Sequence, residues 1–178
     1  VSPQAEMYME KGSPRLGERI DAEPMQSFSA DAKGDDIVGE PNDEDGITVP
    51  ADGIRTQPGA THTQAVKCEG NGKVAGWVDW NRNGVFDDAE KSDEVACSAS
   101  GSATLSWTVP GDVVRSVDGE DGTGAETFMR LRITADNNGD GQKPTGGTAT
   151  GEVEDYRIAV RVPTLQLVKN VDNKYATA

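Results

Sequence analysis

The stretch VAGWVDWNRNGVFDDAE, residues 74–90, joins two different patterns. Over residues 74–80 one set of residues, Val74, Gly76, Val78 and Trp80, alternates with a second set, Ala75, Trp77 and Asp79. This period of two is typical of a β-strand. The following residues are rich in Asp, Asn and Gly, which are residues of turns and loops. The stretch therefore predicts a strand that runs directly into an acidic loop.

Three further segments, residues 103–109, 129–134 and 156–162, have the same period of two, and clusters of Gly, Pro, Asn and Asp separate them. Several such strands favour an all-β fold, an antiparallel β-sandwich of the jelly-roll or immunoglobulin-like kind with long acidic calcium-binding loops. In the last two segments arginines alternate with apolar residues, so we expect these arginines on an outer, solvated face of the sandwich. They are Arg130, Arg132, Arg157 and Arg161.

The chain of 178 residues is strongly acidic, with 31 Asp and Glu against 17 Lys and Arg. It lacks the basic surface from which nucleic-acid binders gain affinity, and no apolar run approaches the roughly 20 residues of a membrane-spanning helix. The charge is concentrated in residues 21–45, 79–94 and 136–155. Clustered carboxylates repel one another, and a hard cation such as Ca²⁺ would offset that repulsion through oxygen ligands. A solvated acidic loop is the alternative.

Residues 79–90 match the twelve-residue calcium loop at every ligand position. Gly84 stands at position 6, where the loop turns sharply. The preceding segment is a predicted strand, so this would be an EF-hand-like loop on a β scaffold, and a turn held by Asx hydrogen bonds alone is the alternative. The predicted ligands are Asp79, Asn81 and Asn83 at positions 1, 3 and 5, the carbonyl of Val85 at 7, Asp87 at 9 and Glu90 at 12.

A second metal site would form if acidic segments that are distant in the sequence converge. Glu152 and Glu154 share one face of the strand that ends at Tyr156, while Asp155 lies on the other face. Buried acids are costly unless they are paired or bound to a metal. The candidate ligands of this second site are Asp21, Glu23, Asp35, Asp36, Asp43, Glu44, Asp45, Glu152, Glu154 and Asp155.

A third, weaker candidate is DNNGDG at residues 136–141, which repeats the opening spacing of a calcium loop. Its ligands would be Asp136, Asn138 and Asp140, but position 12 is Gly147 rather than Glu. An Asx-rich turn explains this motif at least as well.

The two cysteines, Cys68 and Cys97, and the single histidine, His62, do not form a common structural zinc motif. We expect the cysteines to form a disulfide, which would stabilise the fold by about 3.6 kcal/mol on the loop-entropy account. Two buried free thiols in a cytosolic protein are the alternative.

Several motifs together resemble the GEVED domain and the lectin-like non-repetitive domain of CshA-type fibrillar adhesins. They occur in the same order as in that family and span residues 16–162. The motifs are the acidic groups within residues 16–46, the segment GWVDWNRNGVFD at 76–87, TVP at 108–110, RLR at 130–132 and GEVEDY at 151–156.

The resemblance implies an extracellular all-β module of a wall-anchored or secreted bacterial adhesin. Its partner would be a host or bacterial surface ligand, a glycan or glycoprotein, with contacts from Trp80 and from Gln142 and Thr145. The other interpretation is a calcium-rigidified spacer that binds no ligand. Catalysis is not expected, because the sequence contains a single His and neither a paired nucleophile nor a phosphate-binding loop.

The expected organisation has three parts within a larger multidomain chain, where the module would act as a monomer. Residues 1–15 form an N-terminal arm at the edge of the domain, and residues 16–162 form the sandwich. Pro163 ends the last predicted strand, so residues 163–178 are expected to hold a linker and the first strand of a following stalk domain.

Overall fold

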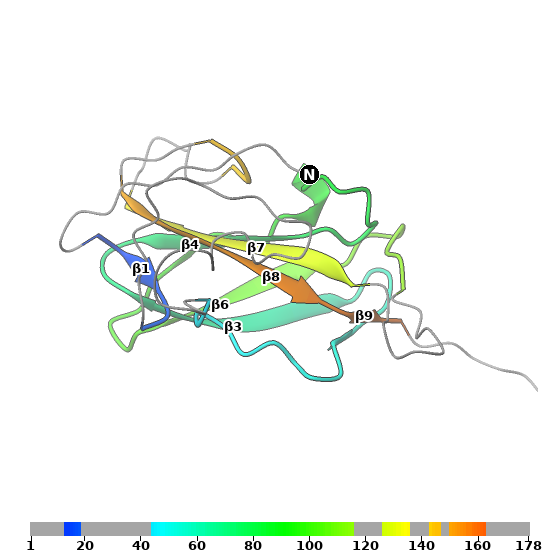
Figure 1. Cartoon of the computed structure of the whole chain (residues 1–178), viewed down its shortest axis with the longest axis horizontal. Coiled ribbons are helices and arrows are strands. Elements are labelled where there is room, and N and C mark those ends of the chain that lie inside the picture. Colours follow the sequence, from blue (N-terminus) through cyan, green and yellow to red (C-terminus); the bar gives the residue numbers. More distant parts are fainter. Residues whose placement is uncertain (1–12, 19–43, 116–125, 136–142, 147–149, 163–178) are drawn as a thin grey trace, which may run out of the picture.

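The computed structural model describes residues 13–18, 44–115, 126–135, 143–146 and 150–162, and these residues form an all-β structure. Two antiparallel sheets lie against each other (Figure 1). One sheet contains β1 (Arg15–Leu16), β3 (Thr61–Glu69) and β6 (Ser102–Thr108), in the order β1-β3-β6. The other contains β4 (Lys73–Val78), β5 (Val95–Ala96), β7 (Thr127–Thr134) and β8 (Gly151–Ile158), in the order β5-β4-β7-β8.

A short strand pair and a 3₁₀ turn complete the described fold. β2 (Ile54–Arg55) and β9 (Val160–Arg161) pair in parallel. A single 3₁₀ turn, η1 (Asp88–Glu90), interrupts the acidic loop after β4. The described residues contain no helix long and apolar enough to cross a membrane.

The core lies between the two sheets, and the sheets approach each other closely at Gly76. A Cβ atom placed on Gly76 in β4 would lie 2.6 Å from Cζ2 of Trp107 and 3.1 Å from Cδ1 of Leu105, both on β6 of the facing sheet. Only a residue without a side chain allows this approach. Around this point Val66, Leu105 and Trp107 of one sheet and Met129, Leu131 and Ile133 of the other form one buried cluster.

The structure confirms the predicted all-β fold with antiparallel sheets, apart from the short parallel pair, and it changes some boundaries. β4 ends at Val78, so the loop begins at Asp79. β8 spans Gly151–Ile158, so the strand that was predicted to hold the acidic run continues past Tyr156 to Ile158. β3 was not predicted, because two of its inward positions carry polar side chains, His62 and Gln64.

The prediction that the arginines of the last strands are solvated is wrong for two of them. Arg130 is 5% exposed and Arg132 is fully buried. They lie on the outer face of the β5-β4-β7-β8 sheet, but the backbone of residues 143–146 covers them and its carbonyl groups accept their hydrogen bonds. A period of two shows which side chains share a face but not whether a loop later covers it.

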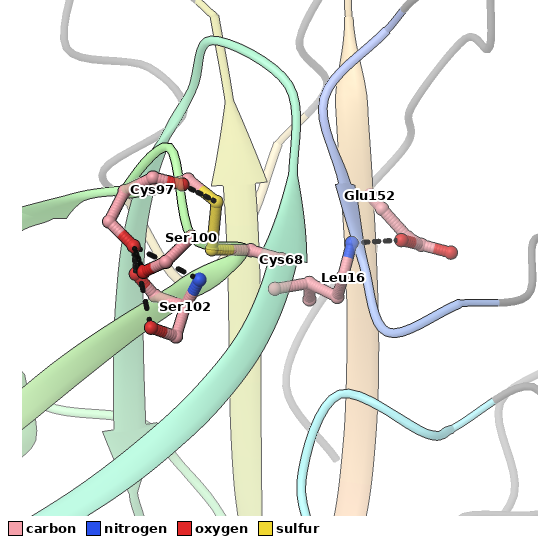
Figure 2. Close-up of a disulfide and its surroundings, with 7 residues drawn as sticks. Leu16, Cys68, Cys97, Ser100, Ser102 and Glu152 are labelled. Atoms are coloured by element: carbon pink, nitrogen blue, oxygen red, sulfur yellow. Dashed lines mark hydrogen bonds between the residues drawn. A yellow bond between two sulfur atoms is a disulfide. The ribbon is translucent and has the colours of Figure 1, made fainter.

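The predicted disulfide is confirmed. Cys68 in β3 is bonded to Cys97, which follows β5, so the bridge joins the two sheets. Figure 2 shows the bridge close to Leu16, whose side chain is fully buried beside it. Arg15, assigned to the N-terminal arm, pairs with Glu69 as part of β1. The expectations for residues 1–12 and 163–178 lie outside the described residues.

Candidate functional site

The loop at residues 79–90 is anchored in the core where it leaves β4. The amide of Asp79 donates to the carbonyl of Phe128 at 3.0 Å, and the Thr127 hydroxyl donates to the carbonyl of Asp79 at 2.5 Å. The next residue, Trp80, is fully buried, with its ring edge-on to His62 at 5.9 Å between centroids. The first loop positions are therefore held by the folded sheets.

The first half of the loop turns its side-chain oxygens inward onto its own backbone. The two carboxylate oxygens of Asp79 accept hydrogen bonds from the amides of Asn83, at 3.0 Å, and Gly84, at 2.9 Å. Oδ1 of Asn81 accepts from the same Asn83 amide at 3.0 Å. Gly84 has a φ of 79°, a left-handed conformation that favours glycine. Positions 1 and 3 of the predicted calcium loop thus converge on one point.

Glu90 closes the loop. The 3₁₀ turn η1 returns the chain, so that the two oxygens of Glu90 accept from the amides of Asp87, at 3.0 Å, and Asn81, at 3.3 Å. The side-chain amide of Asn83 donates to Asp87 at 3.0 Å. Hydrogen bonds therefore connect all five predicted side-chain ligands within one loop.

The electrostatics of this loop are unusual because two carboxylates are buried in it. Asp79 is 4% exposed and Glu90 is 1% exposed. Burial raises the pKa of Glu90, and the nearby charge of Asp79 raises it further, while hydrogen bonds from backbone amides lower it. Among the described residues neither carboxylate has a basic side chain in an ion pair. A cation with oxygen ligands would offset both the burial and the repulsion.

In the described part of the chain, no three Asp, Glu, His or Cys side chains lie together as an assembled metal site. The loop differs from such a cluster because its predicted ligands include two asparagines and the carbonyl of Val85. All of these donors are oxygens, which is the chemistry that Ca²⁺ prefers. The donor set therefore fits calcium, although backbone amides occupy its carboxylates in this structure.

The second acidic region lies on the inner face of β8 and holds segments from the N-terminal part of the chain. Oε1 of Glu154 accepts from the amides of Asp45, at 3.3 Å, and Gly46, at 3.2 Å, and Oε2 accepts from the hydroxyl of Tyr156 at 2.7 Å. The Tyr156 oxygen in turn accepts from the amide of Ile47 at 3.2 Å.

Glu152 completes this group, which we call the clasp: Glu152, Glu154 and Tyr156. Oε2 of Glu152 accepts from the amide of Leu16 at 2.5 Å (Figure 2). Gly46 is needed for the close approach, because a Cβ atom there would lie 2.3 Å from Oε2 of Glu154. The clasp thus fastens both β1 and the segment after Glu44 to β8.

Burial raises the pKa values of Glu154 and Tyr156 in the clasp. Glu154 is 3% exposed, and burial raises its pKa to about 7 in spite of the hydrogen bonds that favour the carboxylate. Burial, followed by the adjacent charge of Glu154, raises the pKa of Tyr156 well above its usual range.

The predicted convergence of acidic segments is therefore observed for Asp45 and the clasp, with backbone amides as partners. Asp155 is separated from Glu152 and Glu154, because it lies on the opposite face of β8 and pairs with Arg130 at 2.6 Å. It cannot share one ion with them. The other candidates, Asp21, Glu23, Asp35, Asp36 and Asp43, lie outside the described residues, as do Asp136, Asn138 and Asp140 of the weaker site.

The structure does not support all three predicted ligand contacts, Trp80, Gln142 and Thr145. The prediction that Trp80 contacts a ligand is wrong, since its side chain is fully buried in the core. Gln142 lies outside the described residues. Thr145 is half-buried, and its carbonyl accepts a hydrogen bond from Arg132 at 3.2 Å.

Several positions that shape the clasp were not predicted from the sequence. The clasp binds backbone amides of Leu16, Gly46 and Ile47, and a backbone amide leaves no mark in a sequence. The glycine at position 46 is the one signal that pointed to a close approach there.

One family model matches the chain, that of the GEVED domain, over residues 73–159. No curated protein and no solved structure gives a significant match. The matched residues begin at β4 and include both the 79–90 loop and the clasp. The order of strand, acidic loop and closing acidic strand is thus the part that the family model matches, and residues 73–159 of this chain form a GEVED domain.

Proposed function

We propose that this chain is a non-catalytic, calcium-stabilised module of an extracellular bacterial surface protein, of the CshA adhesin type, with the 79–90 loop as its calcium site. One observation carries the proposal: two carboxylates, Asp79 and Glu90, are buried in one loop with calcium-loop spacing and, among the described residues, have no basic partner. The disulfide supports an oxidising, extracellular location.

Calcium would be held by the side chains of Asp79, Asn81, Asn83, Asp87 and Glu90 and by the carbonyl of Val85. Bound there, it supplies two positive charges that neutralise the buried carboxylates. The protein provides the strand that fixes the first ligand, the left-handed Gly84 that turns the loop and the 3₁₀ turn that returns Glu90.

The test is a thermal melt of the protein in EDTA and in millimolar CaCl₂. We expect a higher melting temperature in calcium, and the variant Asp79→Asn with Glu90→Gln should lose that increase. Asp88→Ala is the matched control, because Asp88 is an exposed acid in the same loop at a position that contributes no ligand. A melting temperature that is equal in EDTA and in calcium would refute the calcium site.

We also propose that the module binds a host or interbacterial surface ligand, a glycan or glycoprotein, at the end of the sandwich formed by this loop. Among the described residues the two exposed large apolar side chains are Val85, on the loop, and Val114. The second lies beside the loop, because its amide donates to the carbonyl of Trp80 at 2.7 Å. These two neighbouring apolar side chains, Val85 and Val114, would form one edge of a binding surface.

A glycan and glycoprotein array, probed with and without chelator, tests this second proposal. We expect calcium-dependent binding that Val85→Ser with Val114→Ser weakens while the melting temperature changes little. Uniformly negative arrays would leave the calcium-rigidified spacer as the function of the module.

A further inference from the structure

Arg130 touches two loops that are far apart in the sequence. Its guanidinium carbon lies 5.4 Å from the ring centroid of Phe86, at position 8 of the 79–90 loop. Its Nη1 donates to the carbonyl of Pro144 at 2.8 Å. Asp155 holds the same guanidinium with two hydrogen bonds, of 2.7 and 2.6 Å. The side chain is 5% exposed and contacts both loops at once, so a displacement of the planar guanidinium on one side changes its contact on the other.

Arg132 holds the second loop from the neighbouring position on the same face of β7. Its guanidinium donates to the carbonyls of Lys143, Thr145 and Gly146. Together with the Pro144 carbonyl on Arg130, four consecutive carbonyls face two buried cationic side chains. Segment 143–146 is therefore positioned by arginine side chains of the sheet.

The 79–90 loop rests on the same outer face at a second point. Lys91, which follows the last predicted calcium ligand, lies 5.7 Å from the ring centroid of Trp77. Trp77 is the cross-strand partner of Arg130, so the two side chains are neighbours on the outer face. Both the middle and the exit of the loop are thus in contact with the part of the sheet that positions segment 143–146.

We propose that Arg130 couples the two loops, so that calcium binding in the 79–90 loop also orders segment 143–146. The coupling rests on the calcium site proposed above. Phe86 lies between two predicted ligand positions, Val85 and Asp87, so an ion that fixes those positions also fixes the Phe86 ring. A fixed ring restricts Arg130, and Arg130 restricts the carbonyl of Pro144.

The coupling would give calcium a role in ligand recognition. Segment 143–146 belongs to the loop that includes the predicted contact Thr145, and a loop that is ordered in advance loses less conformational entropy when a ligand binds. Coupling of this kind is reciprocal, so a ligand bound at segment 143–146 would tighten the binding of calcium by the same factor.

The test measures hydrogen–deuterium exchange of peptides that contain residues 143–146 in the whole chain, in EDTA and in saturating CaCl₂, with melting temperatures from the same samples. In the wild type we expect calcium to slow exchange of this segment. In Phe86→Leu, which keeps an apolar side chain but removes the aromatic face, the calcium-induced slowing should shrink by about two- to tenfold, while the melting temperature still rises. Asp88→Ala is the matched control and should behave as the wild type, since Asp88 is exposed in the same loop and contributes no predicted ligand.

Arg130→Lys, which keeps the charge but loses the planar fork, should reduce the slowing as much as Phe86→Leu, and combining the two changes should add little. If calcium raises the melting temperature but leaves exchange of residues 143–146 unchanged, the coupling is wrong and the calcium site stands. If Phe86→Leu retains the full slowing, Arg130 does not couple the loops. If calcium changes neither quantity, the calcium site fails and the coupling fails with it.

Discussion

Two acidic regions of this molecule bury carboxylates, and they satisfy them in different ways. In the 79–90 loop the amides that donate to Asp79 and Glu90 lie within nine residues of the acceptor. In the clasp the amides of Leu16 and Gly46 lie 136 and 108 residues away from Glu152 and Glu154. The first region is a local turn with two like charges inside it, and the second is a long-range fastening between the N-terminal part and β8.

The difference shows that hydrogen bonds from either local or distant partners can offset the cost of burying a carboxylate. Where the partners are local, spacing in the sequence identifies the site, and the repulsion that remains calls for a cation. Where the partners are distant amides and a tyrosine hydroxyl, their hydrogen bonds favour the carboxylate and offset part of the cost of its burial. The same acidic composition is therefore compatible with the proposed calcium site in one region and forms a structural fastening in the other.

Removing the disulfide should have the largest effect on the free energy of unfolding. It measures what the covalent crosslink contributes beside the hydrogen bond from Leu16 to Glu152 of the clasp. Cys68→Ala with Cys97→Ala is expected to lower the free energy of unfolding by about 3.6 kcal/mol, because the open loop gains entropy in the unfolded chain. Urea denaturation measures the loss, and thiol labelling of the denatured, non-reduced wild type should find no free thiol. A wild type that labels fully would contradict the bridge.

The second largest effect is expected in the pH dependence of stability, which reports on Glu154 of the clasp. The pKa of Glu154 is raised from 4.5 to about 7, so the folded protein binds a proton there that the unfolded chain releases. Its contribution is fully present below about pH 4.5 and is lost as the pH rises through about 7, a decrease of about 3 kcal/mol. Urea denaturation between pH 4 and 8 should show this decrease in the wild type and not in Glu154→Gln. Equal pH profiles would contradict it.

Calcium should act on the loop and leave the clasp unaffected. At a free concentration one hundred times its dissociation constant, calcium should stabilise the protein by about 2.7 kcal/mol. Glu154→Gln should keep this gain, because its side chain contacts the N-terminal segments and not the loop. Chemical denaturation with and without calcium measures both values. Loss of the gain in Glu154→Gln would mean that the two regions are not independent.

The smallest effect is expected from a single hydrogen bond of the clasp. Glu152→Ala removes the acceptor for the buried amide of Leu16 and should lower the free energy of unfolding by about 2 kcal/mol, in the presence or absence of calcium. Glu152→Gln, which retains an acceptor oxygen, should recover most of the loss. Identical stabilities of the Ala variant and the wild type would show that this bond does not fasten β1.

Much of the fold could be predicted from the sequence, because alternation with period two identified β4, β6, β7 and the end of β8. β3 was missed because His62 and Gln64 interrupt the apolar face. Arg130 and Arg132 were placed on the correct face but were expected in water, because alternation along a strand does not show that residues 143–146, between β7 and β8, lie over that face.

The sequence by itself determined the strand pattern, the ligand spacing of residues 79–90 and the pair of cysteines, because each depends on neighbours along the chain or on residue type alone. Only the tertiary structure decided which groups Glu152 and Glu154 bind, that Trp80 is buried, and that Arg130 lies between Phe86 and Pro144. Those contacts join backbone and side-chain groups of distant segments. Folding brings them together, and a backbone amide or carbonyl is the same at every position of a sequence.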